Sequence, residues 1–224
     1  MKLKLLLYFF FAISILVGCN KKNVQLPLIE IDGIIEIQNH SSIWIFYEVN
    51  KEDTSAVLNK NNKLLNTHWI YNIDRRLTMD KIAPILEEMQ KGRNRESIHK
   101  IEGMLNYFSY ANVISENISL VKFDSISFIF KDEKIKIYPI EKAEKPNIQL
   151  EITNDTYLID EESIDSEQLL QRLNNIISKD TVSTPKIILK YPGNLTYQNY
   201  LSVKVLLSEL RLQVDMNEYI YTIK

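Results

Sequence analysis

The chain has little cysteine, glycine and histidine: one, five and three residues among 224. A single cysteine cannot form an internal disulfide, so the fold depends on its apolar core. The few glycines argue against Gly-rich phosphate-binding loops and long flexible linkers. The histidines, His40, His68 and His99, show neither HxH nor HExxH spacing. The sequence therefore predicts no metal site and no cofactor.

The chain also lacks an excess of basic charge. Removing residues 1–18 takes Lys2 and Lys4 from the 27 basic residues and leaves 25 against 29 acidic ones, a net charge of −4. A protein that neutralises phosphates needs clustered Lys and Arg. We therefore do not expect nucleic acid to be a partner.

A long apolar run lies at the N-terminus, which reads MKLKLLLYFFFAISILVGC. Lys2 and Lys4 come first, and the apolar core Leu5–Val17 follows, interrupted only by Ser14. This core is shorter than the roughly 20 residues that a membrane-spanning helix needs. Residues 1–18 are therefore predicted to be a secretory signal peptide that is removed, rather than a retained membrane helix.

The residues Leu16, Val17, Gly18 and Cys19 resemble the bacterial lipobox. The resemblance implies that the Cys19 thiol receives a diacylglycerol, that the chain is cut before Cys19, and that the new amino terminus is acylated, with palmitate as a typical chain. Two or three acyl chains exceed what stable membrane anchoring requires. Residues 19–27 would then form a lipid-anchored linker, and the absence of an acidic pair in residues 20–23 favours a periplasm-facing location.

Two segments repeat one pattern. Residues 67–89 and 186–210 each contain a short apolar strand, a polar turn, Leu-Thr and then helical spacing of apolar residues. Thr78 and Thr196 occupy the expected N-cap positions. The pattern predicts an α/β (α+β) fold with two related two-layer modules, residues 28–138 and 147–224, joined by a charged linker at 139–146 that Pro139 and Pro146 bound.

Individual elements follow from apolar periodicity and turn residues. In the second module we expect strands at 148–152, 186–191 and 219–223, a helix from Thr196, and a helix capped by Asp165 with Leu169, Leu170, Leu173, Ile176 and Ile177 on its buried side. In the first module we expect strands at 28–37, 43–49, 69–73, 118–123, 127–130 and 135–138, a helix after Thr78 and another at 98–110. Pro84 removes an amide, so the first of these helices should start late or bend.

The segments IQLEITND, DSEQLLQRLNNIIS, KIILKYPGNLTYQNYLSVKVLLSEL and EYIYTIK resemble, in pattern and spacing, the periplasmic domain of the ExbD and TolR biopolymer-transport proteins. That family carries, in a retained transmembrane helix, an aspartate that takes part in using the proton gradient. Residues 2–18 contain no acidic residue. The resemblance therefore implies an envelope module that self-associates or docks protein segments, without the motor function.

The sequence contains no recognisable catalytic motif. GxSxG is absent, and Cys19 is expected to carry lipid. The acidic run from Asp160 to Glu167 lacks calcium-loop spacing and suits the start of a helix. Arg75 and Arg76, in the turn before a helix, could hold a phosphate or carboxylate, or could simply be solvated.

Three functional hypotheses remain open. The leading one is a non-enzymatic, membrane-anchored module that binds or scaffolds envelope proteins, through sheet-edge pairing or homodimerisation. The alternative is an envelope hydrolase whose site is assembled from distant residues. The third is a carrier of small or lipidic ligands, which the lack of a barrel pattern supports least.

Overall fold

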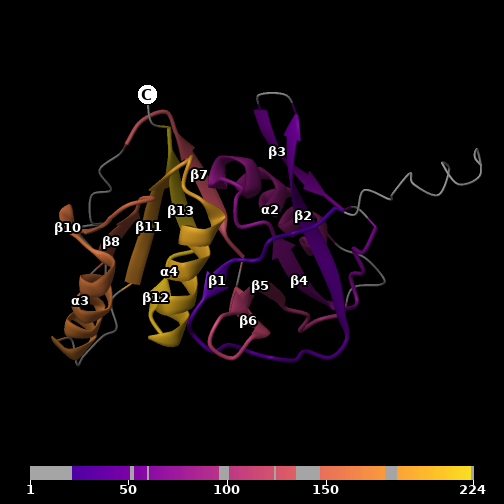
Figure 1. Cartoon of the computed structure of the whole chain (residues 1–224), viewed down its shortest axis with the longest axis horizontal. Coiled ribbons are helices and arrows are strands. Elements are labelled where there is room, and N and C mark those ends of the chain that lie inside the picture. Colours follow the sequence, from indigo (N-terminus) through magenta and orange to yellow (C-terminus); the bar gives the residue numbers. More distant parts are fainter. Residues whose placement is uncertain are drawn as a thin grey trace, which may run out of the picture.

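The computed structural model describes residues 22–50, 53–59, 61–95, 101–123, 125–134, 147–179 and 186–222. The signal peptide, Cys19, His99, the linker 139–146 and the strand expected at 135–138 lie outside these residues. Figure 1 shows two sheets side by side, the first in indigo to magenta with α2, and the second mainly in orange to yellow with α3 and α4. The predicted α/β class with two sheet modules is confirmed.

The first sheet contains β1 (Leu28–Ile29), β2 (His40–Asn50), β3 (Asp53–Leu58), β4 (His68–Ile73), β5 (Asn106–Asn112) and β6 (Asn117–Phe123). Its order is β1-β5-β4-β2-β3, and β6 also pairs with β5. The sequence alternates as a half-buried strand should: Ile43 and Ile45 are buried, whereas Trp44 and Phe46 between them are partly exposed. Helix α2 (Met79–Asn94) packs on the side of Ile43 and Ile45.

The second sheet contains β7 (Ser127–Lys131), β8 (Asn147–Ile152), β9 (Tyr157–Ile159), β10 (Glu162–Ile164), β11 (Lys186–Pro192), β12 (Gln213–Val214) and β13 (Asn217–Tyr221). Its order is β10-β9-β8-β11-β13-β7, with β12 pairing β11. The order β9-β8-β11-β13 repeats the order β3-β2-β4-β5 of the first sheet, and β9, like β3, runs antiparallel to its neighbour. The two modules are therefore related in topology.

The repeated turns meet each other at the centre of the molecule. Thr78 and Thr196 form an isolated antiparallel bridge, in which the Met79 amide donates to the Leu195 carbonyl at 2.9 Å and the Tyr197 amide donates to the Leu77 carbonyl at 2.7 Å. Each bond has its counterpart in the other module, so the two helix starts are related by an approximate two-fold axis. The first amides of a helix have no partner within it; here each module supplies partners for the other.

The hydrophobic core is continuous across both modules. Phe108 of β5 packs edge-on against Tyr197 of α4 (Tyr197–Glu209), with ring centroids 6.0 Å apart. Buried residues from α2, α3 (Ser166–Lys179) and both sheets belong to one cluster. The alternate residues Ile70, Tyr107 and Leu120 form a separate cluster that contains no helix residue. We call this side of the first sheet its helix-free face.

The helix starts agree with the sequence. α2 follows Thr78, and α4 follows Thr196, whose hydroxyl accepts a bond from the Asn199 amide. α3 begins with a capping box, because Asp165 accepts from the Gln168 amide at 2.8 Å while the Gln168 side chain accepts from the Asp165 amide at 3.3 Å. Pro84 lies inside α2 and does not delay its start, since the helix already begins at Met79.

Several expectations need correction. The helix expected at 98–110 is wrong, because residues 106–112 form β5, held between β4 on one side and β6 on the other. The strand expected at 28–37 shortens to β1 plus a bridge between Ile34 and Leu120. The strand at 127–130, assigned to the first module, is β7 and pairs with β13 in the second sheet. Leu170, expected on the buried side of α3, is exposed.

Candidate functional site: the open edge of the first sheet

The two arginines singled out in the sequence, Arg75 and Arg76, lie in the turn between β4 and α2. The Arg76 guanidinium donates from Nε and Nη2 to the two carboxylate oxygens of Asp74, at 2.9 and 2.8 Å, and lies over the Tyr47 ring. Burial alone would raise the Asp74 pKa, but bonds from Arg76 and from the amides of Gln25 and Arg76 lower the pKa below its ordinary value. Arg76 thus already holds a carboxylate, one belonging to the chain.

Arg75 is half-buried, and its side chain has no ion pair or hydrogen bond with any residue in the described ranges. Its backbone carbonyl accepts from the Gln198 amide at 3.3 Å, and its amide donates to the Gln25 carbonyl. Of the two guanidinium groups, therefore, that of Arg76 is already engaged by Asp74, whereas that of Arg75 has no partner among the described residues. Anion binding at this corner stays a prediction that would depend on Arg75.

The two histidines in the described residues bond to backbone groups. His40 Nδ1 lies 2.8 Å from the Ile37 carbonyl oxygen, and His68 Nδ1 accepts from the Leu105 amide at 3.0 Å. Neither is hydrogen-bonded to a carboxylate or a hydroxyl, as a hydrolytic triad would need. Within the same ranges no group of three His, Cys, Asp or Glu side chains could hold a metal ion.

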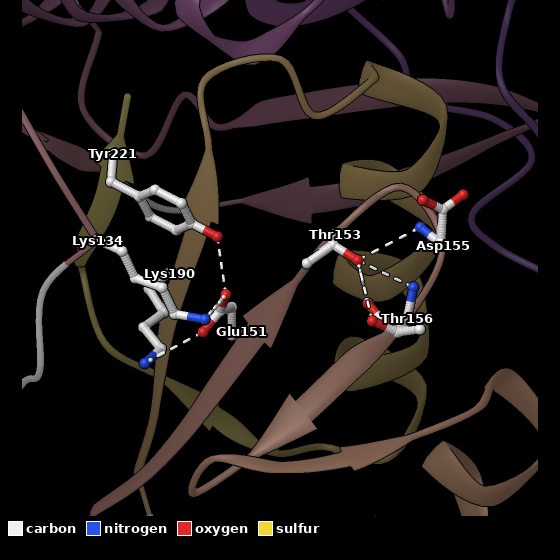
Figure 2. A network of polar contacts seen from close by, with 7 residues as sticks. All are labelled: Lys134, Glu151, Thr153, Asp155, Thr156, Lys190 and Tyr221. Atoms are coloured by element: carbon white, nitrogen blue, oxygen red, sulfur yellow. Dashed lines mark hydrogen bonds and ion pairs between the residues drawn. The ribbon is translucent and has the colours of Figure 1, made fainter. Parts of the chain in front are cut away.

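A buried polar cluster lies in the second sheet, as Figure 2 shows. Glu151 and Lys190 are only 1% and 2% exposed and pair with Nζ 3.2 Å from Oε2. The other carboxylate oxygen, Oε1, accepts from the Tyr221 hydroxyl and from Lys134, both at 2.7 Å. The Tyr221 pKa is raised above its ordinary value, mainly by burial and in addition by the hydrogen bond to Glu151.

A second cluster lies on the side of this sheet that α4 covers. The fully buried Glu218 carboxylate accepts from the hydroxyls of Tyr191 and Tyr200 and pairs with Lys204 at 2.8 Å. Every polar group named in the two clusters already has a partner within them. They bind β8, β11, β13 and α4 together, and we assign them a structural role.

None of these clustered residues is among the site residues predicted from the sequence. Lys190 and Glu151 interrupt the apolar runs KIILKYP and IQLEI. A charge inside a buried strand predicts an opposite charge on the neighbouring strand, because an unpaired buried charge is too costly. A charged residue inside an apolar strand is therefore the sequence pattern from which Lys190 and Glu151 could have been predicted.

Edge strands are where a sheet can accept another strand, and most edges here are covered. The Gln90 side chain bonds both the amide and the carbonyl of Ile126, at 2.7 and 3.0 Å, and Glu87 accepts from the Phe128 amide, so α2 protects β7. The Gln198 side chain does the same for both backbone groups of Leu28 in β1, at 2.9 Å each.

Two further edges are also restricted. Ile34 pairs with Leu120 at the outer side of β6, with backbone bonds of 3.0 and 2.8 Å. β10 is only three residues long and carries Glu162, which pairs with Arg172. Short strands and charges are the usual protection of a sheet edge.

The outer edge of β3 is different. β3 ends the strand order of the first sheet, and its sequence is DTSAVL. The Asn59 amide donates to the Trp44 carbonyl at 2.8 Å, which fixes the antiparallel alternation. By that alternation Val57 and Ser55 bond to β2, while the amides and carbonyls of Thr54, Ala56 and Leu58 point outward.

Only one of these outward residues has a backbone partner in the described part of the chain. Lys81 of α2 donates to the Thr54 carbonyl and hydroxyl. No described group pairs with the outward backbone groups of Ala56 or Leu58. Ala56, Val57 and Leu58 are also partly exposed and apolar. The β3 edge therefore offers adjacent donors and acceptors beside apolar side chains, which suits an added strand.

Comparison of the chain with protein-family models, curated proteins and solved structures finds no match. Among the described residues no helix has both the length and the apolar character needed to cross a membrane.

Proposed function

We propose that this protein is a lipid-anchored, non-enzymatic protein of the bacterial cell envelope that binds an extended segment of another envelope protein along β3. Acylated Cys19 would hold it on a periplasm-facing membrane surface. The single observation that carries the proposal is the outward-pointing backbone of Ala56 and Leu58 at the end of the first sheet, which no group among the described residues pairs with.

Strand addition is physically reasonable at this edge. A backbone hydrogen bond contributes about 0.5–1.5 kcal/mol net, and Ala56 and Leu58 together offer two donors and two acceptors. Val57 lies opposite Phe46 on the helix-free face, whereas Ala56 and Leu58 pack toward the core. Alternate side chains of an added strand would therefore meet two different surfaces, which gives sequence preference.

The resemblance to the ExbD and TolR periplasmic domain supports the same class of function. The second module has the element order that the resemblance implies, with β8, α3, β11, α4 and β13 in that sequence, and β9 and β10 added between β8 and α3. Because residues 2–18 contain no acidic residue, we propose a link to such a transport system as a docking component rather than as a proton-driven motor.

A photo-crosslinking experiment tests the proposal. A photoreactive amino acid replaces Ser55 in the intact lipoprotein within its own membranes, and adducts are identified by mass. We expect one adduct with an envelope protein, which disappears when Ala56→Pro is added. Proline removes only the outward amide at this position, so the β2–β3 ladder keeps its bonds. Circular dichroism checks that the variant is folded.

A matched control places the same photoreactive group at Ser163 on the restricted edge formed by β10. The Ser163 probe should not give the adduct. An adduct at Ser55 that survives Ala56→Pro, or the same adduct from both positions, would contradict binding at β3. An adduct with twice the mass of the chain would show that a second copy occupies the edge.

A further inference from the structure

The helix-free face of the first sheet presents two aromatic rings beside the start of the described chain. Trp44 and Phe46 on β2 stack with ring centroids 6.5 Å apart, and both are partly exposed. The Lys22 ammonium lies 5.8 Å from the centre of the Phe46 ring and pairs with Glu48, the next residue on this side of β2. The N-terminal segment is therefore held at this face.

The same face carries exposed aliphatic side chains on its other side. Leu28 of β1 and Ile118 of β6 both lie in register with Ala111 of β5, so the three side chains share one face. Leu28 is 47% exposed and Ile118 is 55% exposed. This face therefore carries exposed apolar side chains in two places. Trp44 and Phe46 lie on β2, and Leu28 and Ile118 lie on β1 and β6.

Only a short N-terminal segment separates Cys19 from the part of the chain that is bonded beside this face. The Gln25 amide donates to the Asp74 carboxylate at 3.1 Å, and the Gln25 carbonyl accepts from the Arg75 amide at 2.8 Å. Cys19 precedes Lys22 by three residues. At no more than about 3.6 Å per residue, the Cys19 α-carbon lies within roughly 11 Å of that of Lys22.

We propose that the helix-free face of the first sheet turns toward the membrane that carries the Cys19 lipid and contacts it through its exposed parts, with Trp44 and Phe46 at the headgroup boundary. The middle of the face, Ile70, Tyr107 and Leu120, is buried against Ile37 and Leu105 and takes no part in this contact. This inference rests on the lipid anchor of the proposed function. A tether this short holds the protein against the surface rather than at a distance from it. Tryptophan favours the membrane–water interface, and Leu28 and Ile118 add apolar area that leaves water there.

The proposed orientation is compatible with strand addition at β3. A new strand would extend the sheet within its own plane, and that plane would lie along the membrane surface. The partner segment would therefore be bound parallel to the membrane.

The two tryptophans of the chain allow a direct test. Trp44 is partly exposed on this face, whereas Trp69 is 2% exposed in the core. The mature chain, residues 19–224, is coupled through its one cysteine, Cys19, to a maleimide lipid in phosphatidylcholine vesicles whose acyl chains are brominated. Bromine quenches indole fluorescence only at close range. We expect loss of the Trp44 emission, and no loss in Trp44→Phe, which retains Trp69.

Two substitutions at exposed sites provide a matched pair. Ile118→Asp places a charge on the proposed membrane face and should restore fluorescence, whereas Leu170→Asp, at an exposed position of α3, should leave quenching unchanged. Unquenched Trp44 in the coupled chain, or quenching that Ile118→Asp does not reduce, overturns the inference. Quenching that disappears when envelope protein is added would assign the face to a protein partner and would also overturn it.

The chemical coupling separates this inference from the anchor itself. If the coupled chain shows quenching but mass spectrometry finds Cys19 unmodified in cells, the lipid anchor of the proposed function fails, and the inference fails as a description of the cell. If Cys19 is acylated in cells and the coupled chain is not quenched, the inference fails and the anchor stands.

Discussion

Thr78 and Thr196 pair with each other in an antiparallel bridge, although they cap helices in different modules. The neighbouring bonds are reciprocal: the Asp80 amide donates to the Gly193 carbonyl, and the Gln198 amide donates to the Arg75 carbonyl. Such contacts require the two turns to approach closely. This close approach explains why a glycine, Gly193, occupies one of the two turns.

Gly193→Ala should destabilise the protein. A Cβ at residue 193 would lie 3.2 Å from the Cβ of Asp80, a contact tighter than most Cβ contacts in proteins, so one of the two turns would have to shift by a few tenths of an ångström. We expect a loss of about 1–3 kcal/mol in the free energy of unfolding, as for overpacked sites, measured by urea denaturation. Gly92→Ala in α2 is the control, because nothing lies within 4 Å of the new methyl group; it should gain about 0.5–1 kcal/mol. Equal effects would contradict the close approach of the turns.

Glu151→Gln should destabilise the second module strongly. The substitution leaves the buried Lys190 without its negative partner, and breaking a buried pair typically costs about 3–5 kcal/mol. Lys134→Ala should cost much less, because the Lys134 side chain is 53% exposed. A double variant, Glu151→Leu with Lys190→Met, should recover much of the loss in the same denaturation measurement. Failure of the double variant to recover would show that the cluster does more than balance charge.

Stability should fall in acid because of Asp74 and Glu151. Burial alone would raise both pKa values, but hydrogen bonds, from Arg76 to Asp74 and from Lys134 and Tyr221 to Glu151, lower them below the ordinary 3.8 and 4.5. A lowered folded-state pKa means that the unfolded chain binds more protons. The stabilisation is therefore complete above the ordinary pKa values and is lost as the pH falls through the folded-state values.

The measurement is the free energy of unfolding between pH 7 and pH 3. Asp74→Asn should be less stable at pH 7 and should lose less on acidification than the unsubstituted chain. An unchanged slope would show that the Asp74 carboxylate titrates alike in the folded and unfolded states.

Asp165→Ala should weaken α3 more than Thr78→Ala weakens α2. Asp165 accepts a bond from the Gln168 amide, and losing such a cap costs about 1 kcal/mol. The Thr78 side chain makes no capping bond to the helix backbone, and its hydroxyl donates to Asp80 instead. Urea denaturation of the two variants gives the comparison. A larger loss for Thr78→Ala would contradict it.

The repeated helix starts could be predicted from sequence because their signals are local. Leu-Thr, a turn and helical spacing occur together in both copies, and both helices begin after the expected threonine. By contrast, Ile98, Ile101, Leu105 and Phe108 imitate helical spacing, yet residues 106–112 form a strand. Pairing with β4 and β6 overrides that local pattern.

The candidate site was harder to predict because an edge is a property of the whole sheet. Nothing in DTSAVL indicates whether that strand is inside the sheet or at its border. The answer depends on the order of strands far apart in the chain. The protection of β1 by Gln198 and of β7 by Gln90 likewise joins residues distant in sequence. Only the structure therefore shows that the outer edge of β3 is open within the described part of the chain.

The bidentate contact between Gln198 and Leu28 has a mechanical consequence. It ties the segment that leads from the N-terminus to a helix of the second module. If Cys19 carries the proposed lipid, a pull on it would first meet the Gln25 bonds to Asp74 and Arg75 in the first module. Force that passes beyond them would reach β1, whose contact with Gln198 leads into α4 of the second module.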